Sequence, residues 1–95
     1  YQNGSATSYT SNVSYAGDWS HTVTVDGGKG KIKYGYDTYL LNEDYCSTYH
    51  SDKEHQAVIS HGNGGDEKAY CANAGAWTKT VFVKHVAKPV WKLLY

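Results

Sequence analysis

The 95-residue chain has no methionine, no arginine, one proline and one phenylalanine. It also lacks any apolar run near the roughly 20 residues that a membrane-spanning helix needs. Because even an initiator methionine is missing, we expect a processed chain that has lost a secretory signal peptide; a trimmed sequence is the alternative. These absences predict a secreted, extracellular protein without membrane insertion.

The missing arginines bear on the partners. All nine basic residues are lysines, and five of them lie between Lys68 and the C-terminus, a stretch without Asp or Glu. Lysine attracts phosphate as a point charge and lacks the forked guanidinium contacts that read base edges. We therefore expect anionic partners and no nucleic acid. The alternative is that these lysines are solvated strand faces that keep sheet edges from pairing.

Tyrosine is abundant: ten Tyr and three Trp stand against one Phe, and hydrophobic residues make up 40% of the chain. Tyr and Trp suit surfaces that are apolar on one side and wet on the other, such as sheet faces and recognition patches. A chain of this length forms one domain with a modest core. The composition predicts a single β-rich domain.

The two cysteines, Cys46 and Cys71, predict one disulfide in an oxidising compartment. Closing that loop would contribute about 3 kcal/mol, a large share of the stability of so small a domain. Two reduced, buried thiols are the alternative.

Short alternating segments separated by turn residues predict six to eight antiparallel strands. Residues 20–26 and 31–36 favour a hairpin, and residues 44–50 and 55–60 favour another. The fold class expected is all-β, an antiparallel β-sandwich of two small sheets over residues 19–95, with a small barrel as the alternative. Residues 1–18 are expected to form a polar N-terminal arm or an edge strand.

Side-chain alternation assigns faces within these strands. Ile32, Tyr34 and Tyr36 are expected on one face of their strand. In residues 44–50, the tyrosines and Ser47 share one face, and Cys46, Thr48 and His50 share the other. The segment 61–66 reads as a turn, and Gly75 is expected to mark a bulge in a strand that continues to residue 86.

Three of the five histidines, His50, His55 and His61, lie close together around the turn at residues 51–54. Three facing imidazoles with a carboxylate could hold zinc, but the spacing matches neither the HExxH helix pattern nor a CxxC pair. Surface histidines on a hairpin are the default interpretation. No GxSxG elbow or phosphate-binding loop is present. We therefore expect no enzyme, no bound metal and no cofactor.

Two motifs together resemble the lactococcin 972 bacteriocin family. The first is "STYHSDKEHQAVI" (47–59), and the second is "AGAWTK" (74–79). Their order, their spacing and the aromatic C-terminus "KPVWKLLY" are also similar to that family. The resemblance covers about residues 45–95.

This resemblance implies a secreted antibacterial β-sandwich that acts on the cell-wall precursor lipid II and blocks septum building without forming pores. The matching positions are Ser47, Tyr49, His50, Lys53, His55, Ala74, Gly75, Trp77 and Lys79. Tyr49, His50, His55 and Lys79 are expected to be exposed contacts, whereas Trp77 is expected in the core. The full ligand-binding set predicted is Tyr49, His50, Lys53, His55, Trp77, Lys79 and Lys84.

The sequence is also compatible with other functions. The tyrosine content also fits a carbohydrate- or surface-binding module without killing activity. The histidines fit a zinc protein or a secreted enzyme, and exposed strands fit an interaction domain of a larger assembly. The expected partner is lipid II or another anionic cell-surface glycan, with contact at the membrane surface, and a homodimer through sheet edges is compatible with each function.

Overall fold

The computed structural model describes residues 6–9, 17–39, 42–61, 66–85 and 88–95. Within them, eight strands make only antiparallel pairs, which confirms the all-β prediction. The strands are β1 (Ala6–Tyr9), β2 (Trp19–Val25), β3 (Gly30–Asp37), β4 (Glu43–His50), β5 (His55–His61), β6 (Asp66–Ala72), β7 (Val81–Lys84) and β8 (Pro89–Leu94).

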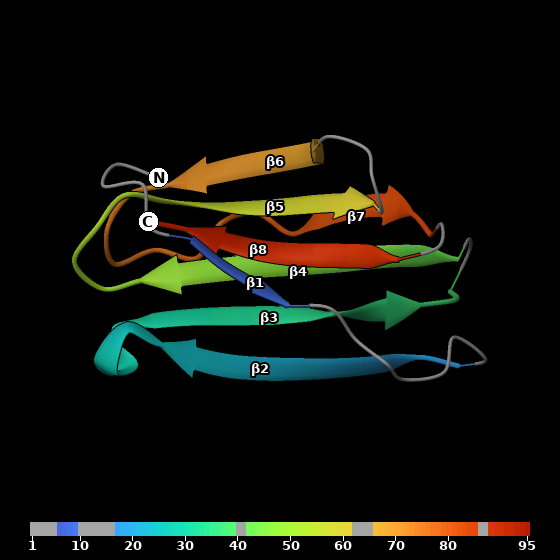
Figure 1. Ribbon diagram of the computed structural model, residues 1–95, viewed down its shortest axis with the longest axis horizontal. Coiled ribbons are helices and arrows are strands. Elements are labelled where there is room, and N and C mark those ends of the chain that lie inside the picture. The colour runs from blue at the N-terminus through green and yellow to red at the C-terminus, as the bar shows by residue number, and fades with distance from the viewer. Residues whose placement is uncertain (1–5, 10–16, 40–41, 62–65, 86–87) are drawn as a thin grey trace.

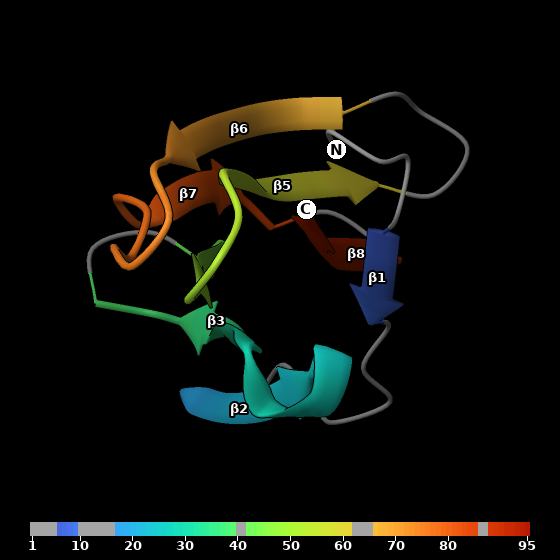
Figure 2. The ribbon, with the colours of Figure 1, turned by 90° about the vertical axis from the view of Figure 1, so that its left-hand side faces the viewer.

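The strands form two four-stranded sheets. The first sheet has the order β1-β8-β5-β6, and the second has the order β2-β3-β4-β7 (Figure 1). An end view separates β1 and β8 of the first sheet from β2 and β3 of the second (Figure 2). Strand β1 is therefore an edge strand, while residues 1–5 and 10–16 of the expected arm lie outside the described residues.

The described part of the chain contains no helix with the length and apolarity needed to cross a bilayer. Its one helical element is a three-residue 3-10 turn, Asp26–Gly28.

This turn closes the predicted hairpin of β2 and β3. Asp26 and Gly27 have φ angles of 53° and 64°, in the left-handed region that Gly and Asp tolerate better than most residues. The register pairs Trp19 with Tyr36 at one end and Val25 with Gly30 at the other. The short Asp-Gly-Gly sequence is thus the local cause of the hairpin.

Alternation along β3 and β4 follows the prediction. Ile32, Tyr34 and Tyr36 are buried, while Lys31 and Lys33 between them are exposed. In β4, every second residue is buried, namely Asp44, Cys46, Thr48 and His50. The odd-numbered residues of β3 and β4 therefore face outward from the second sheet.

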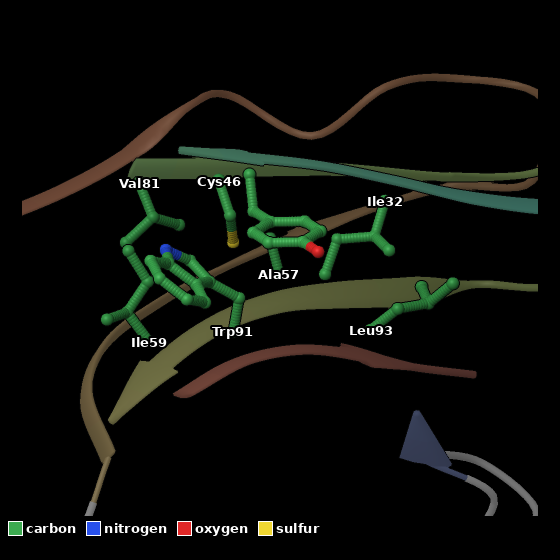
Figure 3. Close-up of a cluster of buried hydrophobic side chains, with 8 residues drawn as sticks. Ile32, Cys46, Ala57, Ile59, Val81, Trp91 and Leu93 are labelled. Atoms are coloured by element: carbon green, nitrogen blue, oxygen red, sulfur yellow. The ribbon is translucent and has the colours of Figure 1, made fainter. Parts of the chain in front are cut away.

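The core lies between the sheets. Ile32, Cys46 and Val81 of the second sheet point toward Ile59, Trp91 and Leu93 of the first (Figure 3). The Trp91 ring lies 5.0 Å from the Tyr34 ring and 5.6 Å from the Trp19 ring, centroid to centroid. Aromatic packing therefore fills much of the space that aliphatic side chains occupy in other small domains.

The predicted disulfide is wrong. Cys46 and Cys71 are both unoxidised. Cys46 faces the core from β4, and its Sγ lies 3.8 Å from the Val58 carbonyl oxygen. Cys71 lies on β6, at the edge of the other sheet, where alternation with the inward-packed Tyr70 turns it outward to solvent. An inward and an outward side chain on different sheets cannot form a disulfide unless the backbone moves.

The predicted hairpin of residues 44–50 and 55–60 is wrong, because β4 and β5 belong to different sheets. The segment 73–80 also differs from the prediction. It forms a turn and an isolated bridge, and strand β7 covers only Val81–Lys84. Gly75 has a φ angle of 82° and lies in the turn, not in a strand bulge. The predicted turn at 61–66 falls mostly on residues 62–65, which lie outside the described residues.

Candidate ligand-binding face

The two motifs that resemble the bacteriocin family form one structural unit. Tyr49 pairs with Trp77 in an isolated antiparallel bridge. The Thr78 N–H donates to the Thr48 carbonyl at 2.9 Å, and the Gly75 N–H donates to the His50 carbonyl at 2.8 Å. Segments that are more than twenty residues apart in the chain thus meet at one end of β4.

His50 supports this unit from inside. It is 0% exposed, so the expectation of an exposed contact is wrong. Its Nδ1 accepts hydrogen bonds from the N–H groups of Asp52 and Lys53, both at 3.1 Å. Since Nδ1 accepts, the ring proton lies on Nε2, which donates to the Asp26 carboxylate at 2.8 Å. His50 therefore positions two turns and cannot touch a ligand at the surface.

His55 is also 0% exposed, which again contradicts the predicted exposure. Its Nδ1 lies 2.8 Å from the Lys53 carbonyl oxygen, and its Nε2 lies 2.8 Å from the Ala76 carbonyl oxygen. The ring thereby ties the first motif to the second.

The third histidine of the sequence cluster belongs to a different site. His61 Nε2 lies 3.1 Å from Oδ2 of Asp44, and His85 Nδ1 lies 2.9 Å from Oδ1 of the same carboxylate. The Asp44 side chain is fully buried. Asp44 is at the end of β4 opposite His50. Among the described residues, no group of three or more His, Cys, Asp or Glu side chains could hold a metal. The zinc interpretation of this cluster therefore has no site in the described part of the chain.

Lys31, Tyr49 and Trp77 form a surface close to the buried His55, and we call this surface the lysine–aromatic platform. The Tyr49 and Trp77 rings are 5.6 Å apart, and the Lys31 Nζ lies 5.8 Å from the centroid of the Tyr49 ring. Trp77 is 46% exposed, so its expected place in the core is wrong. Trp77 lies outside the regular strands and is held by the bridge to Tyr49 and by the hydrogen bonds of Gly75 and Thr78 to β4.

The remaining predicted residues are dispersed. Lys53 is half-buried, and its Nζ lies 5.5 Å from the centroid of the Tyr95 ring. Lys79 is exposed two residues after Trp77. Lys84 is exposed on β7, where it pairs with Glu43 at the end of β4 far from Tyr49. The structure thus brings Tyr49 and Trp77 together and leaves Lys84 outside the platform.

Acidic residues flank the platform end. The Lys29 Nζ lies 3.2 Å from Oδ2 of Asp52, and this hydrogen bond lowers the pKa of Asp52. A hydrogen bond from His50 similarly lowers the pKa of Asp26. Both carboxylates are therefore ionised at neutral pH. Because the Lys29–Asp52 pair is more than half exposed, it contributes little to stability.

Sequence reasoning missed a second feature, which we call the outer groove, a hollow of about 470 Å3 on the outward face of the second sheet. Its apolar lining comes mainly from Tyr45 of β4 and Phe82 of β7, which pair in register with ring centroids 5.9 Å apart. Its polar lining includes Lys33 and the carboxylates of Asp18 and Asp37. The alternation of side chains along β3 and β4 could have predicted that Lys33, Asp37 and Tyr45 share the outward face.

Comparisons of the chain with protein-family models, with curated proteins and with solved structures find no match. The resemblance to the lactococcin 972 family therefore stays a prediction, and the geometry of the outward face carries the functional argument.

Proposed function

We propose that the protein is a secreted antibacterial protein that binds a cell-wall precursor such as lipid II and inhibits wall and septum synthesis without catalysis. The observation that carries this proposal is the junction of the two family-like motifs, which together build the lysine–aromatic platform. The two motifs contribute one aromatic ring each, and β3 contributes the lysine.

The chemistry of the platform suits a sugar attached to a pyrophosphate. An exposed Trp and a neighbouring Tyr offer apolar ring faces to a sugar. Lys31 and Lys33 both face outward from β3 and offer two positive charges to a pyrophosphate. Attraction between exposed charges is screened at physiological salt, so we expect binding to weaken as salt is added.

The buried histidines have a positioning role in this proposal. His55 ties the Lys53 and Ala76 carbonyls together, and Tyr49 lies 6.4 Å from the His55 ring, centroid to centroid. This arrangement restrains Tyr49 and Trp77 before a ligand arrives. Pre-organised side chains lose less conformational entropy on binding.

Inhibition would follow from sequestration. A precursor held by its pyrophosphate and sugar is denied to the enzymes that build the wall. The proposed site of action is extracellular, at the outer surface of the cell membrane, and the protein does not insert into that membrane. A homodimer through an exposed sheet edge remains part of this proposal.

The test is binding to vesicles that contain lipid II, compared with vesicles of equal anionic charge without it. We expect selective binding that weakens with salt, and about tenfold weaker binding for Trp77→Ala. Tyr39→Ala is the matched control, because Tyr39 is an exposed aromatic residue near the opposite end of the sheet. Equal binding to both kinds of vesicle would reject the proposal.

A second candidate is a carbohydrate-binding module without killing activity, and the outer groove is the observation that favours it. Growth inhibition of Gram-positive bacteria discriminates between the two. A zone of inhibition that Trp77→Ala reduces supports the antibacterial function, whereas glycan binding without any inhibition supports the module.

A further inference from the structure

The outer groove is produced by one close approach between two strands. Gly35 faces outward from β3 but is buried, because the Tyr45 side chain lies across it. A Cβ atom at Gly35 would lie 2.6 Å from the Tyr45 Oη and 2.3 Å from the Trp19 carbonyl oxygen. The Tyr45 hydroxyl donates to that same carbonyl at 3.3 Å. The ring of Tyr45 is thereby fixed as the floor of the groove.

Phe82 forms the wall beside this floor. It is 42% exposed and pairs with Tyr45 across β4 and β7, with the two ring planes tilted by 46°. The strand register and the hydrogen bond of Tyr45 hold the two rings in place without a ligand. An exposed, pre-formed aromatic corner of this kind suits a flat ligand with an apolar face.

The polar groups around the corner include both acceptors and donors. The Asp18 carboxylate is oriented by the Thr38 N–H and hydroxyl, at 2.9 and 2.6 Å. The Asp37 carboxylate is oriented by the Tyr39 N–H at 3.1 Å. Lys33 and Ser20 supply donors from the neighbouring strands. Oriented carboxylates accept hydrogen bonds from hydroxyl groups, whereas they repel phosphates.

We propose that the outer groove binds a neutral sugar ring, with one ring face on Tyr45 and Phe82 and its hydroxyl groups donating to Asp18 and Asp37. None of these four residues belongs to the set predicted from the sequence. Two carboxylates beside an aromatic corner distinguish this site from the lysine–aromatic platform, which attracts anions. The same face therefore has one subsite for a neutral sugar and another for an anionic group.

The spacing of the two subsites indicates the length of the ligand. Tyr45 and Tyr49 both face outward from β4, four residues apart, which corresponds to about 13 Å along the strand. Ser47 and Lys33 lie opposite each other between them. A single sugar fills one subsite only, whereas a glycan of more than one unit reaches both. This deepens the proposed function and rests on it for the anionic end of the ligand.

The experiment is titration of the labelled protein with a β-1,4-linked N-acetylglucosamine tetramer, followed by amide chemical shifts. We expect saturable shifts at Tyr45, Phe82 and Asp37. Phe82→Ala should weaken binding by about tenfold, and Asp37→Asn should weaken it more moderately. Lys68→Ala is the control, because Lys68 is an exposed residue of β6 in the other sheet, away from both subsites.

The outcomes separate the two proposals. Tetramer binding that Phe82→Ala weakens and Lys68→Ala leaves unchanged supports the sugar subsite, even if lipid II vesicles are not bound. No binding of the tetramer, or shifts at Tyr49 and Trp77 alone, overturns the subsite and leaves the lipid II test unaffected. Folding of each variant is checked by its amide spectrum, and Asp37→Asn provides a second variant that keeps the acceptor for the Tyr39 N–H.

Discussion

His50 donates a hydrogen bond to Asp26 at 2.8 Å and so joins the end of β4 to the turn between β2 and β3. The same ring accepts from the Asp52 and Lys53 N–H groups. One buried histidine thus holds two turns beside the lysine–aromatic platform, and its carboxylate partner makes the stability of this end depend on pH.

Asp26→Asn should remove the pH dependence of this contact. The hydrogen bond from His50 lowers the pKa of Asp26 from its ordinary value of 3.8. A carboxyl group with a lowered pKa in the folded state stabilises the fold above its unfolded pKa and loses this effect as the pH falls through its folded pKa. Wild type should therefore exceed the variant in stability at about pH 6, and this difference should shrink as the pH falls below the ordinary pKa of 3.8.

Urea unfolding followed by tryptophan fluorescence measures this difference. Asn suits the site because it tolerates the φ angle of 53° at this position better than most residues. A stability difference that stays constant across the acid range would show that the Asp26 charge plays no part.

Asp44→Ala should lower the free energy of unfolding by about 3 kcal/mol. Asp44 is fully buried, accepts hydrogen bonds from His61 of the first sheet and from His85, and thereby connects the two sheets. Chemical denaturation measures the loss. Glu43→Ala is the matched control on the outward face of β4, and it should change stability by less than about 0.5 kcal/mol. Similar losses for the two variants would contradict the structural role of Asp44.

Gly35→Ala should destabilise the fold by about 2 kcal/mol or more, because the added Cβ would lie 2.3 Å from a backbone oxygen and one of the strands must move. The variant should also displace Tyr45 and weaken sugar binding in the outer groove. Gly17→Ala is the control, since no atom lies within 4 Å of its added Cβ. Thermal unfolding compares the two, and equal transition temperatures would refute the close approach.

The two thiols should differ in reactivity. Cys71 is exposed and should react with Ellman's reagent in the native protein. Burial raises the pKa of Cys46 to about 12, so this thiol should react only after unfolding. Cys71→Ser should abolish the native reaction. A native mass lower by two hydrogens, restored by a reductant, would instead indicate the disulfide that the structure lacks.

Alternation made much of the second sheet predictable. Lys31 and Lys33 are exposed between buried Ile32 and Tyr34, as a period of two requires. The same period places His50 on the face of Cys46 and Thr48, which is the buried face. The expectation that His50 is exposed conflicted with this pattern, and the pattern was right. Local periodicity therefore carried more information than the chemical character of the side chain.

Pairing between distant segments was not predictable in this way. The position of Trp77 depends on its bridge to Tyr49, and the sheet to which Cys71 belongs depends on the pairing of β6 with β5. Neither pairing can be recognised from the pattern of hydrophobic residues around Trp77 or Cys71. The outer groove likewise needs the register that puts Gly35 beside Tyr45 and Tyr45 beside Phe82.

The sequence by itself determined the all-β class, the hairpin of β2 and β3 and the inward and outward faces of their strands, because turn chemistry and alternation act between near neighbours. Only the tertiary structure decided that the cysteines are apart, that the three histidines have separate partners and that the two motifs share one surface. These relations depend on strand order and register, which are set by packing across the whole core.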